Sequence, residues 1–134
     1  PPWSMGHFVT ALAERPAAAD PNAYGWRRHC RLYTTPDDAE ALQILTAARC
    51  RYVITADLRS VLPAYAAAAG RGGIPLAATF SERIHRSTSR NPAPFLTLAL
   101  DSRTGSRSAE GRFQPQYRIW RVTASPAAAA PSSR

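Results

Sequence analysis

The run of residues best suited to binding chemistry stands at the start of the chain, where Pro2-Trp3-Ser4-Met5-Gly6-His7-Phe8-Val9 opens the sequence. Serine is a favoured helix N-cap, and the apolar residues that follow have helical spacing, so the pattern predicts a short helix that ends before Pro16. An indole at such a helix start has two interpretations. It packs against the helix as a staple, or its face and the neighbouring hydroxyl hold an extended peptide. The candidate peptide-binding residues are Trp3, Ser4, Met5, Gly6 and His7.

The remaining polar residues do not form a recognisable catalytic set. The acids Asp37, Asp38 and Glu40 occupy a predicted first helical turn, where carboxylates stabilise the helix dipole. The three histidines lack the spacing of metal ligands. A phosphate-binding glycine loop and a nucleophile elbow are both missing from the sequence. We therefore predict no catalytic residue, no metal site and no cofactor in this chain.

Two cysteines, Cys30 and Cys50, are too few for a disulfide scaffold or a zinc site. Each precedes an apolar stretch, over 31–34 and 51–56. If both stretches are neighbouring strands, a disulfide closing a loop of about 20 residues would contribute roughly 3 kcal/mol. The other interpretation is two unpaired thiols, and the sequence leaves both open.

Composition limits the class of protein. A chain of 134 residues is normally one domain, and its 45% hydrophobic content suits a globular fold. The formal net charge is +8 and every basic residue is arginine, which either reflects codon bias or provides a surface for an anionic partner. The arginines form no block of five or six, so nucleic-acid binding is not expected. We see no signal peptide and no apolar run near the ~20 residues of a membrane helix.

The elements that position these residues follow from hydrophobic periodicity. We predict helices over 36–48, 61–69 and 79–85, and strands over 30–33, 51–56, 95–100 and 113–122. The fold class is α/β: a single mixed-sheet domain over 1–123 with helices packed on the sheet. It contains one βαβ unit over 33–56 and a C-terminal antiparallel hairpin. The Ala/Pro/Ser tail over 124–134 is predicted to be disordered.

Several segments together resemble a known family. Pro2-Trp3-Ser4-Met5-Gly6 is similar to the Trp-Trp-Asp-Tyr-Gly signature that opens the extracytoplasmic C-terminal domain of the oligosaccharyltransferase catalytic subunit. Arg51-Tyr52-Val53-Ile54-Thr55-Ala56-Asp57 resembles that family's "Arg-Tyr-Val-Val-x-Asp-Asp" strand, and 117–122 resembles its closing strand. The resemblance spans about residues 2–122.

The resemblance implies a non-catalytic part of a membrane-anchored glycosyltransferase that lies on the extracytoplasmic side. Its partners would be its own N-terminal transmembrane region, which holds a divalent metal and the catalytic acids, and the acceptor polypeptide. Trp3 matches the second tryptophan of the signature, Ser4 its aspartate, Met5 its tyrosine and Gly6 its glycine. Pro2 replaces the first tryptophan, and the helix after Asp57 lacks the lysine or methionine that the family places there. The alternative is a stand-alone binding or structural module with an arginine-rich surface for an anionic partner.

Overall fold

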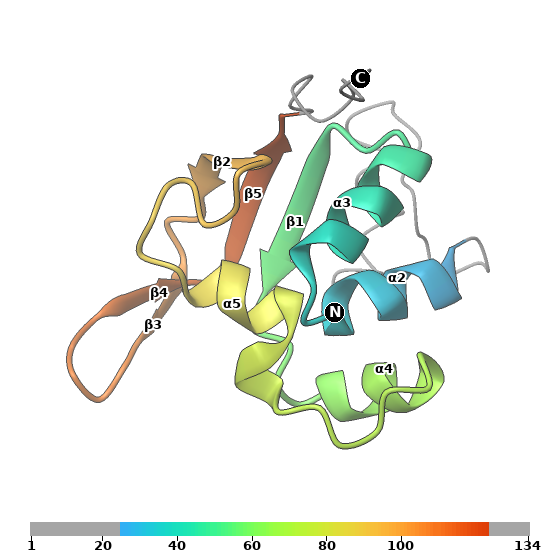
Figure 1. The fold of residues 1–134 in the computed structure, drawn as a ribbon. Helices are drawn as coiled ribbons and strands as arrows, with labels where there is room; N and C mark the ends of the chain where they lie inside the picture. Colours follow the sequence, from blue (N-terminus) through green and yellow to red (C-terminus); the bar gives the residue numbers. More distant parts are fainter. Residues whose placement is uncertain (1–24, 124–134) are drawn as a thin grey trace, which may run out of the picture.

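The computed structural model describes residues 25–123 (Figure 1). At its centre is an antiparallel sheet in the order β1-β5-β2, formed by β1 (Tyr52–Ala56), β5 (Tyr117–Val122) and β2 (Leu96–Asp101). Trp120 in the middle strand lies opposite Val53 on one side and Leu98 on the other. A separate two-stranded hairpin, β3 (Gly105–Arg107) and β4 (Phe113–Pro115), is inserted between β2 and β5.

Four α-helices and one 3-10 turn accompany the sheet in the described part of the chain. They are α2 (Trp26–Thr34), α3 (Asp38–Ala47), α4 (Leu62–Ala68), η2 (Leu76–Ala78) and α5 (Phe80–Arg86). Helix α5 packs on β1, and α2 contacts α3, α4 and α5 (Figure 1). The core between helices and sheet is filled by aromatic and aliphatic side chains, the largest of them fully buried: Trp120, Phe80, Leu45, Leu58, Leu62, Ile84 and Leu96.

The structure confirms the α/β class, the helices packed on the sheet and the antiparallel pairing of the two C-terminal strands. The prediction of a strand over 30–33 was wrong, because these residues lie within α2. Consequently no βαβ unit forms over 33–56. The strand β1 pairs antiparallel with β5, so the central sheet is antiparallel throughout and not mixed as predicted. The buried residues of α2 recur at helical spacing, with His29 and Cys30 one turn before Tyr33 and Thr34. A run of only four residues is too short for its periodicity to distinguish a helix from a strand.

Helix α3 begins two residues later than predicted. Asp37 is the N-cap and accepts from the Ala39 amide, while the Thr35 hydroxyl donates to Glu40 instead of capping the helix. Burial alone would raise the pKa of Glu40, but hydrogen bonds from Thr35, Arg31 and Arg71 lower it to about 2. Glu40 therefore joins α2, α3 and the segment after α4 through ionised groups.

Some predictions lie outside the described residues. These are the helix that follows Ser4 and the tail over 124–134. Within 25–123, no helix has the length and apolar character required to cross a lipid bilayer.

At Gly105 of the β3–β4 hairpin there is no room for a side chain. Gly105 lies opposite Pro115, and a Cβ at Gly105 would stand 2.0 Å from the backbone oxygen of Gln114. We expect Gly105→Ala to separate the two short strands, because the nearest obstacle is backbone. Faster amide hydrogen exchange at Ser108 and Gln116, whose amides donate across the hairpin to the carbonyls of Arg112 and Thr104, would measure this. Gly72→Ala is the matched control, since a Cβ there meets nothing within 4 Å; equal exchange in the two variants would contradict the prediction.

Candidate functional site

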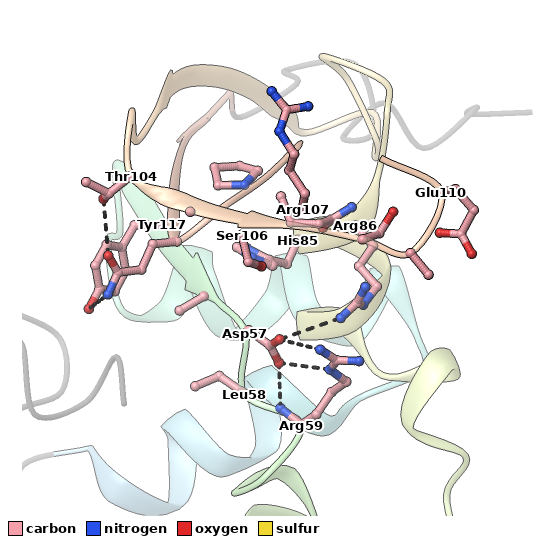
Figure 2. A pocket seen from close by; sticks show the side chains of 17 residues that line it. Asp57, Leu58, Arg59, His85, Arg86, Thr104, Ser106, Arg107, Glu110 and Tyr117 are labelled. Atoms are coloured by element: carbon pink, nitrogen blue, oxygen red, sulfur yellow. Dashed lines mark hydrogen bonds and ion pairs between the residues drawn. The ribbon is translucent and has the colours of Figure 1, made fainter. Parts of the chain in front are cut away.

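An open cleft of about 780 Å³ lies where β1 ends, between α5 and the β3–β4 hairpin (Figure 2). We call it the Asp57 cleft. Asp57, Leu58 and Arg59 enter it from the end of β1, and His85 and Arg86 enter it from α5. The hairpin and its flanking residues close the other side with residues 104–110 and 114–117. Segments that are far apart in the sequence therefore share one polar surface.

Asp57 is the electrostatic centre of the cleft. Its carboxylate accepts from the Arg59 guanidinium at 3.0 and 2.6 Å and from the Arg59 amide at 3.2 Å (Figure 2). Arg86 adds a longer ion pair at 3.7 Å. These hydrogen bonds and charges hold the pKa of Asp57 at about 2, against a usual value of 3.8. The group is half exposed, so the pairing contributes little to stability, but it keeps Asp57 ionised at neutral pH.

His85 anchors the floor of the Asp57 cleft through a buried hydrogen-bond chain. The Trp120 indole donates to the Thr55 hydroxyl at 2.9 Å, and that hydroxyl lies 3.1 Å from His85 Nδ1. Because the backbone of Pro115 can only accept, we assign the histidine proton to Nε2, facing Pro115, and His85 Nδ1 then accepts from the Thr55 hydroxyl. Burial, assisted by the charge of Arg118, lowers the pKa of His85 to about 4. The chain therefore joins β5, β1, α5 and β4 through a neutral imidazole.

This arrangement is suited to binding. A general base needs an accessible lone pair and a pKa near the working pH. Asp57 has too low a pKa, and the His85 ring is buried with its Nδ1 already hydrogen bonded. Over residues 25–123, no group of three or more His, Cys, Asp or Glu side chains is placed to hold a metal ion. The cleft instead offers ionised and hydroxyl groups in an open, polar setting.

A second feature lies between α2 and α4, where four rings pack together. His29 stacks on Tyr33 with centroids 4.4 Å apart, and its other neighbours are Trp26 and the edge of Tyr65. Burial lowers the pKa of His29 to about 4. His29 Nε2 and the Tyr65 hydroxyl are buried without a protein hydrogen-bond partner. We refer to these four residues as the aromatic cluster.

The candidate peptide-binding residues Trp3, Ser4, Met5, Gly6 and His7 all lie outside the described part of the chain. Cys30 and Cys50 are free thiols, the first buried on α2 and the second half-buried before β1. They do not lie on two neighbouring strands, which was the condition for a disulfide between them, and the structure agrees with the other interpretation, two unpaired thiols. Of the residues quoted for the family resemblance, 52–56 do form a strand that delivers Asp57 to the cleft.

Three residues of the cleft were not predicted from the sequence as site residues: Arg59, His85 and Arg86. Two spacings could have predicted part of this arrangement. Arg59 follows Asp57 by two residues and pairs with it. Arg86 follows Glu82 by one helical turn, and their side chains pair at 2.7 Å. Neither spacing predicts that the hairpin closes over these residues.

Comparison with solved structures decides which fold this is. The crystal structure of the C-terminal globular domain of an oligosaccharyltransferase from Archaeoglobus fulgidus matches with a TM-score of 0.69 and 15% sequence identity, covering 90% of this chain and 81% of that one. The chain shares the fold of that domain. A second C-terminal globular domain of oligosaccharyltransferase from the same organism matches with a TM-score of 0.53 and 19% identity, covering 75% of this chain and 64% of that one.

The expected resemblance to oligosaccharyltransferase C-terminal domains is thus confirmed at the level of the fold. No protein-family model matches the chain, and no curated protein matches it. The likeness consequently lies in the arrangement of the elements, with few identical residues retained.

Proposed function

We propose that this chain is the extracytoplasmic globular domain of an oligosaccharyltransferase-like membrane glycosyltransferase and helps to bind the acceptor polypeptide. The observation that carries the proposal is the oligosaccharyltransferase fold across 90% of the chain. The transmembrane region of the same protein would be its partner and would hold the catalytic acids and the divalent metal. The domain itself would position the peptide.

The residues described support a binding role. Asp57 directly follows the strand that resembles a family motif, and it lies in an open cleft with ionised, hydroxyl and amide groups. A polypeptide acceptor presents amides and hydroxyls, which such groups can hydrogen bond. Trp3 and Ser4 would supply a further contact through the indole face and a hydroxyl. Serine lacks the charge of the family's aspartate, so its hydrogen bond to the acceptor would be weaker than one made by a carboxylate.

A peptide titration followed by tryptophan fluorescence tests this proposal. The chain has three tryptophans; Trp120 is fully buried, and Trp26 is replaced by Phe so that Trp3 reports. We expect an Asn-x-Thr peptide to change the emission more strongly and at lower concentration than Gln-x-Thr or Asn-x-Ala. Trp3→Phe in the same background should abolish the response.

Controls separate specific from general peptide binding. Tyr52→Phe changes an exposed aromatic residue on β1 and should leave the titration unaltered. Identical curves for the three peptides would reject acceptor recognition. A response that persists without Trp3 would reject the proposed contact.

A further inference from the structure

The β3–β4 hairpin stands out from the body of the domain (Figure 1). Its two strands pair with each other and with no other strand of the described chain. The loop between them is tight: Gly111 has a φ of 77°, its amide donates to the Ser108 carbonyl at 2.9 Å, and the Ser108 amide donates to Arg112. This is a three-residue hairpin loop that ends in a left-handed glycine. The hairpin therefore has a defined turn geometry and projects from the domain.

One face of the hairpin combines an aromatic ring with a guanidinium group. Arg107 and Phe113 lie directly opposite each other in the register, so their side chains share a face. The Phe113 ring lies across Gly105, whose Cβ position would be 2.9 Å from the ring edge. Phe113 is nevertheless 45% exposed. Arg107 borders the Asp57 cleft, but Figure 2 shows its side chain extending away from Asp57, and Phe113 is not among the residues that line the cleft.

The hairpin is basic. It carries three arginines and one acidic residue: Arg103, Arg107, Arg112 and Glu110. The ion pairs between described residues use other arginines, and the Arg107 guanidinium donates to the Gly111 carbonyl. The same short projection thus carries an exposed aromatic ring and an excess of positive charge.

We propose that the Arg107/Phe113 face of the hairpin docks on an anionic phospholipid surface. Aromatic side chains are favoured at the headgroup level of a bilayer, where one part of the ring is apolar and its surroundings are wet. Guanidinium groups pair with phosphate through two parallel hydrogen bonds. Charge complementarity selects the anionic headgroup over a neutral one. This inference goes beyond peptide binding. It rests on the proposed function only for the presence of a nearby bilayer, and it requires neither Trp3 nor an acceptor peptide.

Co-sedimentation with lipid vesicles tests the inference on the full 134-residue chain. We expect partitioning onto vesicles of phosphatidylcholine mixed with phosphatidylglycerol, and weak partitioning onto phosphatidylcholine alone. Arg107→Gln with Arg112→Gln should weaken the partitioning about fivefold for each arginine. Phe113→Ser should weaken it about tenfold through loss of ring burial.

Matched variants distinguish docking from general charge attraction. Arg27→Gln with Arg51→Gln removes the same charge from exposed positions elsewhere, and Leu100→Ser removes an exposed apolar side chain from β2. Both should affect partitioning less than the hairpin variants. In addition, Phe113→Trp with Trp3 and Trp26 replaced by Phe should show a blue-shifted emission on anionic vesicles.

Three outcomes would overturn the inference. They are an unchanged emission of the Phe113→Trp variant, equal losses in the hairpin and control variants, and binding to heparin but not to vesicles. None of these outcomes bears on the peptide titration, so failure here and failure of the proposed function are distinguishable.

Discussion

Lowering the pH from 6.5 to 4 is expected to reduce the free energy of unfolding by about 6 kcal/mol. His29 and His85 are both buried, and burial lowers the pKa of each from 6.5 to about 4. A shift of that size corresponds to roughly 3 kcal/mol for each group. Denaturant titrations at several pH values would measure the loss.

The direction follows from proton binding. Between pH 6.5 and 4 the unfolded chain binds protons at these histidines while the folded chain does not, so stability rises with pH through this interval. Above pH 6.5 both states hold neutral histidines and the contribution is fully present. Below pH 4 the folded state also binds the protons, and the loss is complete. Glu40 and Asp57, with their lowered pKa values, add a further loss below about 4.5.

Variants assign the effect to the two sites. His29→Phe keeps a ring between Trp26 and Tyr33 and removes one titrating group. We expect it to reduce the slope of unfolding free energy against pH by about 1.4 kcal/mol per pH unit within the interval. His85→Gln should have a similar effect on the slope. A stability that does not vary between pH 6.5 and 4 would show that neither imidazole is kept neutral by the fold.

Trp120→Ala is expected to destabilise the domain by about 3–5 kcal/mol, the range for a large aromatic residue removed from a packed core. Trp120 is fully buried in the central strand, between Val53 and Leu98. Its loss would also leave the Thr55 hydroxyl without its donor. Thermal or denaturant unfolding would measure the change.

The hydrogen-bond chain can be tested separately from packing. Thr55→Val preserves the shape of the side chain but leaves the Trp120 indole nitrogen and His85 Nδ1 without a hydrogen-bond partner. A buried unsatisfied group costs about 1–3 kcal/mol of stability. Thr97→Val is the matched control, because Thr97 is more exposed and bonds only Asn91. We expect the double variant Trp120→Phe with Thr55→Val to be less destabilised than the sum of its parts. Equal costs at Thr55 and Thr97 would contradict the role of the chain.

Much of the fold could be predicted because several local signals agree. The run from Tyr52 to Ala56 is β-branched and aromatic and forms the edge strand β1 of the central sheet. The acids after Pro36 form the first turn of α3, with Asp37 as the cap. The strands around 96–101 and 117–122 pair as expected, since an antiparallel pair can be joined by a connection of modest length.

The candidate site was far less predictable. Cys30–Tyr33 is too short for its sequence to distinguish strand from helix, and in the folded chain it belongs to α2, which packs against α4 and α5. The Asp57 cleft depends on a hairpin that the sequence presents as a polar, Gly/Ser-rich loop. Likewise, the spacing of Thr55, His85 and Trp120 in the sequence does not predict that they form one hydrogen-bond chain.

By itself the sequence determined the α/β class, the positions of most helices and strands, and the resemblance to oligosaccharyltransferase C-terminal domains, because periodicity and capping act between near neighbours. Only the tertiary structure decided that β1 pairs antiparallel with β5, that His85 is neutral, and that Asp57 faces a cleft beneath a projecting hairpin. These features depend on contacts between residues far apart in the sequence, such as Thr55 and His85, 30 positions apart, and Tyr52 and Arg121, 69 positions apart. Burial and charge at such distances are set by the folded chain as a whole, and no local pattern encodes them.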